Sequence, residues 1–223
     1  YMKKEDLDHL IQTLEKHYDV SVDLEGKEFV KIQLDWDYEN RKVHLSMAPY
    51  LQKALRQFDN IVPSKRQDSP YPYTEPKYGA KQQFAEYDTS APVGNDEQKY
   101  VQKVTGKFNW YARGVDSTML TPISALSAQQ AKPTQAMMRR VQHFLDYAAT
   151  KEPAVTTYRA SDMVLAIHSD AGYLNEEGAR SRAGGHHFLS ENVASPSNNG
   201  AIYNEASIIK AVMSSATKAE IGA

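Results

Sequence analysis

The spacing of apolar residues predicts a series of helices and strands in the first sixty positions. Leucine and isoleucine recur every three or four positions, with charges between them, over residues 4–17, which predicts an amphipathic helix. Apolar and polar residues then alternate on both sides of residues 38–42, which predicts two antiparallel strands joined by a polar turn. A helix is predicted to follow from Pro49 to Phe58.

The middle of the chain changes from a proline-rich segment to helical spacing. Residues 61–96 hold five of the ten prolines and show little periodicity, which predicts an extended connector, and its tyrosines indicate that the connector lies against the protein. Helical spacing returns in three segments, 97–112, 120–130 and 134–149, with a break at residues 114–117. These segments predict a helical subdomain.

The pattern changes again after Pro153, where strand-like segments replace the helical spacing. Strands are predicted at 155–160, 163–170, 182–191 and 201–204, followed by a helix over 206–223. The whole pattern predicts a protein of the α+β class.

Composition excludes several classes of function. The chain has 26 Lys and Arg against 28 Asp and Glu, so no overall field draws it to nucleic acid or an anionic membrane, and any basic surface is local. The absence of cysteine excludes disulfides and thiolate chemistry. No apolar run approaches the ~18 residues that span a bilayer, and the charged N-terminus is unlike a signal peptide. We therefore expect an intracellular protein without a membrane partner.

Two acidic residues are candidates for metal chemistry. Asp170 is expected at or near the end of a buried strand, and Glu220 is expected on the last helix. Carboxylates on separate rigid elements can converge on Mg²⁺, and hydrolysis of a phosphodiester by two metal ions uses such a cluster. The alternatives are a turn or cap residue for Asp170 and a solvated helix face for Glu220.

Three stretches in the last third, read in order, carry a family resemblance. The stretches SDAGY, RSRAGGHHFL and SSATKAEIGA resemble the ribonuclease H domain of copia-type LTR-retrotransposon polyproteins. That family shows Ser-Asp-Ala-Asp-Trp, a second strand with serine and glycine, and Ser-Ser-x-x-Ala-Glu. Upstream, EFVKIQLDWDYENRKVHLSMAPYLQKALRQF looks like the end of the reverse transcriptase palm and the start of its thumb. The stretch YVQKVTGKFNWYARGVDSTML is similar to the segment that precedes the family's Arg-Pro-Asp.

The resemblance implies a division of the chain into four parts. They are the end of the palm and the thumb start (1–60), a proline-rich connector (61–96), a helical thumb or connection (97–153), and the N-terminal half of a ribonuclease H-like domain with antiparallel strands and the first helix (154–223). The implied parent activities are RNA-directed DNA synthesis and hydrolysis of RNA in RNA–DNA hybrids. The implied setting is a cytoplasmic virus-like particle or the nucleus.

The resemblance also assigns roles to the two acids. Asp170 and Glu220 match the family's first two metal-binding acids and would ligate Mg²⁺, whereas Gly172 stands at the position of a second aspartate. The last residues look like a helix cut in mid-turn, and the family's remaining acids and its Tyr-x-Asp-Asp motif lie outside this sequence. We therefore expect a fragment, inactive by itself, that works with the remainder of the polyprotein.

Several basic and aromatic residues are candidates for contact with a template-primer duplex or an RNA–DNA hybrid. The set is Lys99, Lys103, Lys107, Arg139, Arg140, Arg180, Arg182 and Trp36. The three lysines are four residues apart and would line one helix face, and the two C-terminal arginines are expected in a turn. The alternatives are a solvated helix face, an ordinary polar turn and hairpin packing of the tryptophan.

Two further patterns are assigned no chemistry. His168, His186 and His187 have no additional ligand at suitable spacing, so packing or surface roles are expected. Gly184-Gly185 lacks the strand-to-helix context of a phosphate loop. For the chain as a whole, the alternative to an enzyme lineage is a non-catalytic relic or a domesticated nucleic-acid-binding or scaffold protein.

Overall fold

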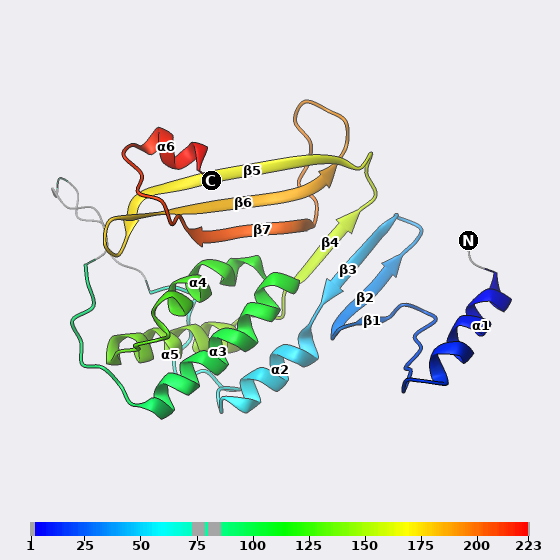
Figure 1. The fold of residues 1–223 in the computed structure, drawn as a ribbon, viewed down its shortest axis with the longest axis horizontal. Helices are drawn as coiled ribbons and strands as arrows, with labels where there is room; N and C mark the ends of the chain where they lie inside the picture. The colour runs from blue at the N-terminus through cyan, green and yellow to red at the C-terminus, as the bar shows by residue number, and fades with distance from the viewer. Residues whose placement is uncertain (1–2, 73–78, 80–85, 223) are drawn as a thin grey trace.

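The protein combines two antiparallel sheets with a group of packed helices (Figure 1). The computed structural model describes residues 3–72, 79 and 86–222. One sheet has the strand order β1-β2-β3-β4 and the other the order β5-β6-β7. The predicted α+β class is confirmed.

Most predicted elements are present with nearly the predicted bounds. The helices are α1 (Lys4–Glu15), α2 (Ala48–Gln57), α3 (Asn95–Gly114), the short 3₁₀ helix η1 (Ser117–Met119), α4 (Leu120–Gln129), α5 (Gln135–Thr150) and α6 (Ala216–Ile221). The strands are β1 (Glu28–Phe29), β2 (Ile32–Asp37), β3 (Lys42–Ser46), β4 (Val155–Arg159), β5 (Val164–Glu176), β6 (Arg180–Ser190) and β7 (Ala201–Ile208). Helix α1 has the predicted position, yet none of its residues is buried.

Strand β4 joins the sheet formed by the first sixty residues. It pairs antiparallel with β3, with Thr156 opposite Leu45 and Tyr158 opposite Val43. The strand-like stretch at 155–160 therefore lies beside the N-terminal hairpin and outside the sheet of the later strands. Alternation of apolar residues specifies a strand and its buried face, but it does not specify which open edge the strand will join.

The predicted helix over 206–223 is wrong. Strand β7 continues through Ile208, and α6 occupies only Ala216–Ile221. The alanine-rich composition is compatible with a helix, but Ala206 lies opposite Gly184 in the β6–β7 ladder and packs against the helical core. These tertiary contacts override local propensity. Ser215 caps the start of helix α6, because its hydroxyl oxygen accepts a hydrogen bond from the Lys218 N–H at 3.2 Å.

The hydrophobic core lies among helices α2 to α5. Phe108 and Phe144 meet edge to face at its centre, with ring centroids 5.1 Å apart, and both side chains are buried. The second sheet contributes few residues to buried apolar surface, namely Ala183 and Phe188. Because burial of one large apolar side chain is worth about 1.5–3 kcal/mol, the helices supply most of the stabilisation. The sheet β5–β7 depends on its contact with α4.

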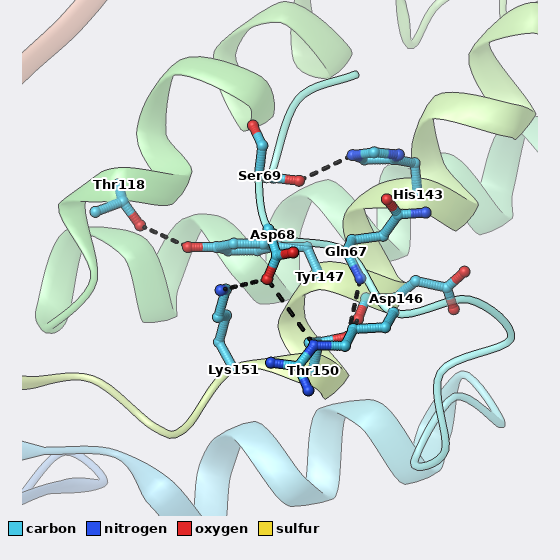
Figure 2. A network of polar contacts seen from close by, with 10 residues as sticks. Gln67, Asp68, Ser69, Thr118, His143, Asp146, Tyr147, Thr150 and Lys151 are labelled. Carbon is cyan, nitrogen blue, oxygen red and sulfur yellow. Dashed lines mark hydrogen bonds and ion pairs between the residues drawn. The ribbon is translucent and has the colours of Figure 1, made fainter. Parts of the chain in front are cut away.

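Polar bonds hold the first part of the connector against α5 (Figure 2). The buried Asp146 carboxylate accepts hydrogen bonds from the Ser64 N–H at 2.9 Å and the Ser64 hydroxyl at 2.6 Å. Asn60 and Gln142 donate to the same carboxylate at 3.2 Å and 3.0 Å. Burial acts to raise the pKa of Asp146, but these hydrogen bonds outweigh it and the pKa lies below its usual value.

The connector tyrosines do not explain this attachment. The described part of the connector lies against the protein as expected, although Tyr71 and Tyr87 are 41% and 67% exposed. Tyr73 and Tyr78 lie outside the described residues. Polar side chains carry the contact instead, among them Lys151, whose ammonium lies 3.1 Å from the Asp68 carboxylate (Figure 2).

The last part of the connector is fixed to the start of α5 through Asp88. Its carboxylate accepts hydrogen bonds from the Thr134 hydroxyl and from the Ser90 N–H and hydroxyl. The Thr134 hydroxyl oxygen caps α5 by accepting a hydrogen bond from the Met137 N–H. The Ser90 hydroxyl oxygen accepts one from the Ala136 N–H at 3.0 Å. The hydrogen bonds from Thr134 and then Ser90 lower the pKa of Asp88 to about 2.

The pKa of Asp88 predicts a loss of stability in acid. A carboxyl whose folded-state pKa lies near 2, below the usual 3.8, stabilises the fold above 3.8, and this contribution disappears as pH falls through about 2. Asp88→Asn should lower the free energy of unfolding by about 1 kcal/mol near neutral pH, allowing for solvent screening. In urea unfolding, its difference from the wild type should shrink as pH falls from about 4 to about 2. Asp19→Asn, at an exposed position, controls for net charge, and a pH-independent deficit for Asp88→Asn would contradict the prediction.

Asn199 and Gly200 join the two sheets. The Asn199 side chain accepts from the Arg159 N–H at 2.7 Å and donates to the carbonyl oxygens of Arg159 and Leu189 at 2.8 Å and 2.9 Å. The Tyr158 hydroxyl donates to the Ala201 carbonyl at 2.7 Å. A Cβ at Gly200 would lie 2.7 Å from the Tyr158 ring, so this position requires glycine.

Gly200→Ala should therefore destabilise the junction. The methyl group has to displace the Tyr158 ring, and such overpacking costs about 1–3 kcal/mol. Gly106→Ala is a matched control, because a Cβ on this residue of α3 meets nothing within 4 Å. It should stabilise the protein by about 0.5–1 kcal/mol, since glycine is unfavourable within a helix. Thermal unfolding of both variants tests this, and equal shifts would show that the tyrosine ring is free to move.

Candidate functional site

Asp170 lies in the middle of β5, opposite Gly184 of β6. The expectation of a buried strand that ends near Asp170 is wrong, because β5 continues to Glu176 and the Asp170 side chain is exposed. The strand continues because its partner is long: β6 begins at Arg180, which pairs with Glu176. A turn near Gly178 can be inferred from the local sequence, but the length of the β5–β6 pairing cannot.

A groove runs beside Asp170, between the second sheet and the helices. It has a volume of about 340 Å³, and Leu120 and Thr121 of α4 form part of its wall. The sheet side is polar, with His168 and His186 next to Asp170. Gly184 leaves the floor open, because a Cβ there would meet only a backbone oxygen at 3.7 Å. A volume near 300 Å³ is at the lower end of small-ligand sites, so the groove accommodates a small polar group or part of one strand rather than a duplex.

Glu220 lies on α6, the helix that packs against β5 and β6. Its neighbour Ala219 is fully buried and anchors the helix, whereas the Glu220 side chain is exposed. Glu220 is not among the residues that line the groove beside Asp170. Asp170 and Glu220 therefore lie on two elements that are in contact, but only Asp170 lines the groove.

The acids are of the right kind for Mg²⁺ but too few for a complete site. Carboxylate oxygens are the protein ligands that Mg²⁺ prefers. Within the described residues, no group of three or more His, Cys, Asp or Glu side chains is placed to hold a metal ion. The described residues therefore do not complete a metal site around Asp170 or Glu220, and we derive no catalytic step through a metal.

His168 and His186 are engaged in packing and hydrogen bonding. His168 and His186 lie directly opposite each other in the β5–β6 ladder, and their rings lie 5.2 Å and 5.1 Å from the buried Phe188 ring. A His186 ring nitrogen lies 2.9 Å from Asn204 Oδ1, and the other lies 3.2 Å from the Asn199 carbonyl oxygen. The cross-strand pair was missed from the sequence because it depends on strand register.

The predicted lysine stripe is present on α3. Lys99 and Lys103 are exposed, and the partly buried Lys107 holds its ammonium 5.8 Å from the Tyr50 ring centroid. On α5, Arg139 is exposed and Arg140 is partly buried. Lys99, Lys103 and Arg139 are the members of this set most open to a polyanion.

Trp36 has a structural partner in the hairpin. Its ring stacks on Tyr38 with centroids 5.8 Å apart, and its Nε1–H donates to the Gly26 carbonyl at 2.8 Å. The side chain remains 43% exposed. This geometry supports hairpin packing and leaves one part of the ring open to solvent.

Arg180 and Arg182 were expected in a turn, and this expectation is wrong because both belong to β6. Arg182 is buried: its Nε donates to Glu176 at 2.5 Å, and its Nη1 donates to the Ser124 hydroxyl at 3.1 Å. Arg182 therefore links the sheet to α4. Arg180 is exposed and is the arginine of this pair that a ligand could reach.

Comparison with family models, characterised proteins and solved structures gives no match for this chain. Within the part of the chain that the structure describes, no helix is long and apolar enough to cross a membrane.

The position of Arg182 predicts a large effect of its substitution on stability. Arg182→Ala should lower the free energy of unfolding by about 2 kcal/mol, because it leaves the Glu176 carboxylate, itself only 20% exposed, without its partner. Arg180→Ala should change it by less than about 0.5 kcal/mol. Urea unfolding of both variants measures the difference. A similar small loss in each would contradict a structural role for Arg182.

Proposed function

We propose that this chain is part of a copia-type retroelement polyprotein, spanning the end of its reverse transcriptase and the first part of its ribonuclease H domain. Its ligand is an RNA–DNA hybrid or a template-primer duplex. It acts together with the remainder of the polyprotein, in a cytoplasmic virus-like particle or the nucleus. The parent activities are RNA-directed DNA synthesis and hydrolysis of the RNA strand of a hybrid.

One observation carries this proposal. Asp170 lies on the first strand of the β5-β6-β7 meander, and Glu220 lies on the helix that follows the meander and packs against β5. The family resemblance implies the same order of antiparallel strands followed by a helix, with an acid on each. The acids are 50 positions apart in sequence, yet they occupy two elements in direct contact.

The exposed charges indicate how a nucleic acid could be held. Lys99, Lys103, Arg139 and Arg180 are exposed and able to contact phosphates without breaking a described ion pair. Asp170 and Glu220 would be this chain's contribution to a Mg²⁺ site. When bound, Mg²⁺ would supply charge neutralisation at the phosphate and activation of water.

The test separates the role of the acids from general attraction to phosphates. Binding of a fluorescent RNA–DNA hybrid is measured by anisotropy at fixed ionic strength, with and without Mg²⁺. Mg²⁺ should raise the affinity of the wild type several-fold, because an ion held by the two acids would neutralise charge on the phosphate. Asp170→Asn and Glu220→Gln should each abolish this increase and leave the metal-independent affinity unchanged.

The matched control is Glu191→Gln, an exposed acid just after β6. It should keep the full Mg²⁺ response. The proposal fails if Mg²⁺ has no effect on hybrid binding by the wild type, or if the increase persists in Asp170→Asn. Metal-independent binding alone would favour a nucleic-acid-binding protein without the nuclease lineage.

A further inference from the structure

A second groove lies at the junction of the two sheets and has an unusual charge distribution. It has a volume of about 310 Å³ and is bounded by the end of α3, by strand β4 and by the segment that leads into β7. Its lining contains the cationic residues Arg113 and Arg159 together with His186, and it contains no aspartate or glutamate. A cleft lined by one sign of charge concentrates its electric field, so this groove favours an anion.

Arg159 carries a free charge in this groove. The Asn199 side chain occupies its backbone N–H and carbonyl, but no described residue bonds to its guanidinium. The group is exposed at the end of β4. A guanidinium presents a planar set of donors that matches two phosphate oxygens at once.

Backbone and neutral donors add to the same wall. The Arg159 N–H points away from β3 toward Asn199, and N–H directions alternate along an antiparallel strand. The Thr157 N–H, two residues earlier, therefore points to the same side, along the edge of β4 that lines the groove. The side chains of Ser117 and Asn198 also line it.

Arg113 lies across the groove at the end of α3. It interacts electrostatically with Tyr203 and Glu205, so its charge is partly neutralised by the β7 acid. The carbonyl groups at the end of α3 oppose an anion, but those of Tyr111 and of Val115, just after the helix, are already hydrogen-bonded. The Thr156 hydroxyl donates to the Val115 carbonyl at 2.7 Å, and the Val115 N–H donates to the Tyr111 carbonyl at 3.0 Å. Arg113 and Arg159 are the arginines that line the groove, and Arg159 is the one without an acidic partner among the described residues.

We propose that this groove between α3, β4 and β7 binds a phosphate-bearing ligand, either a free nucleotide or a phosphate of a single nucleic-acid strand. The volume suits one nucleotide-sized group. Arg113 and Arg159 contact the phosphate, and the β4 edge donates to it through the Thr157 N–H. The inference stands on the lining of the groove and does not require the retroelement lineage.

Binding is measured by calorimetry with inorganic phosphate, adenosine monophosphate and adenosine, and the adenosine titration isolates the contribution of the phosphate. Phosphate and the nucleotide should bind, whereas adenosine should not. Arg159→Gln should weaken nucleotide binding at least about tenfold, the loss expected when one charge-assisted hydrogen bond to phosphate is removed. Arg113→Gln should do the same, and amide chemical shifts of Thr157 and Asn198 should move on titration in the wild type.

The control variant is Arg56→Gln, which removes an exposed arginine of α2 outside the groove and should bind as the wild type does. Thermal unfolding confirms that each variant is folded, and Arg159→Gln is the decisive one because its guanidinium supports no described contact. A short oligothymidylate identifies the source of the phosphate. If the oligothymidylate binds more than about tenfold tighter than the nucleotide and Arg159→Gln loses this binding, the groove is assigned to a strand. Any smaller gain in affinity, or weaker binding, assigns the groove to a free nucleotide.

The proposal is overturned if adenosine binds as well as its monophosphate, if Arg159→Gln binds as tightly as the wild type, or if no phosphate-bearing probe saturates. These outcomes are separate from those of the hybrid-binding test. That test depends on Asp170 and Glu220, and neither residue lines this groove.

Discussion

The edge-to-face contact between Phe108 and Phe144 joins α3 to α5 within the buried core of helices α2 to α5, and residues of both sheets pack against that core. The first sheet contacts this core through Ile32 and Leu45, and the second through Ala206 of β7. Neither sheet buries enough apolar surface to be stable alone, since small sheets require packing on one face. The position of every candidate functional residue therefore depends on the helical core.

Polar contacts determine how the outer segments are placed on that core. Asp146 and Asp88 each collect several hydrogen bonds from the connector or from the start of α5, and Arg182 ties β6 to α4. Such bonds add little net free energy each, but a buried partner left unpaired is costly. They therefore specify one arrangement of the connector and the second sheet more than they stabilise it.

The sequence predicted local elements well and long-range pairing poorly. Helix α5 was visible because apolar residues at helical spacing follow Pro133 and a capping Thr134, all of them local signals. The placement of β4 beside β3 and the extension of β7 through Ala206 depend on partners far away in the sequence, which no local pattern encodes. The choice of Asp170 as a candidate rested on its neighbours, but the groove beside it required the contact of β7 with α4.

The two grooves share part of their lining, and this continuity affects the path that a nucleic-acid strand could follow. Ser117, His186 and Asn204 line both grooves, so a polar path leads from Arg159 and Arg113 at one end to Asp170 at the other. His186 is two residues from Gly184, which pairs with Asp170, so about 7 Å along the strand separate the shared region from that acid. A single strand bound at the cationic end would follow this shared lining toward Asp170. The shared lining therefore connects the two proposed sites along the path of one nucleic-acid strand.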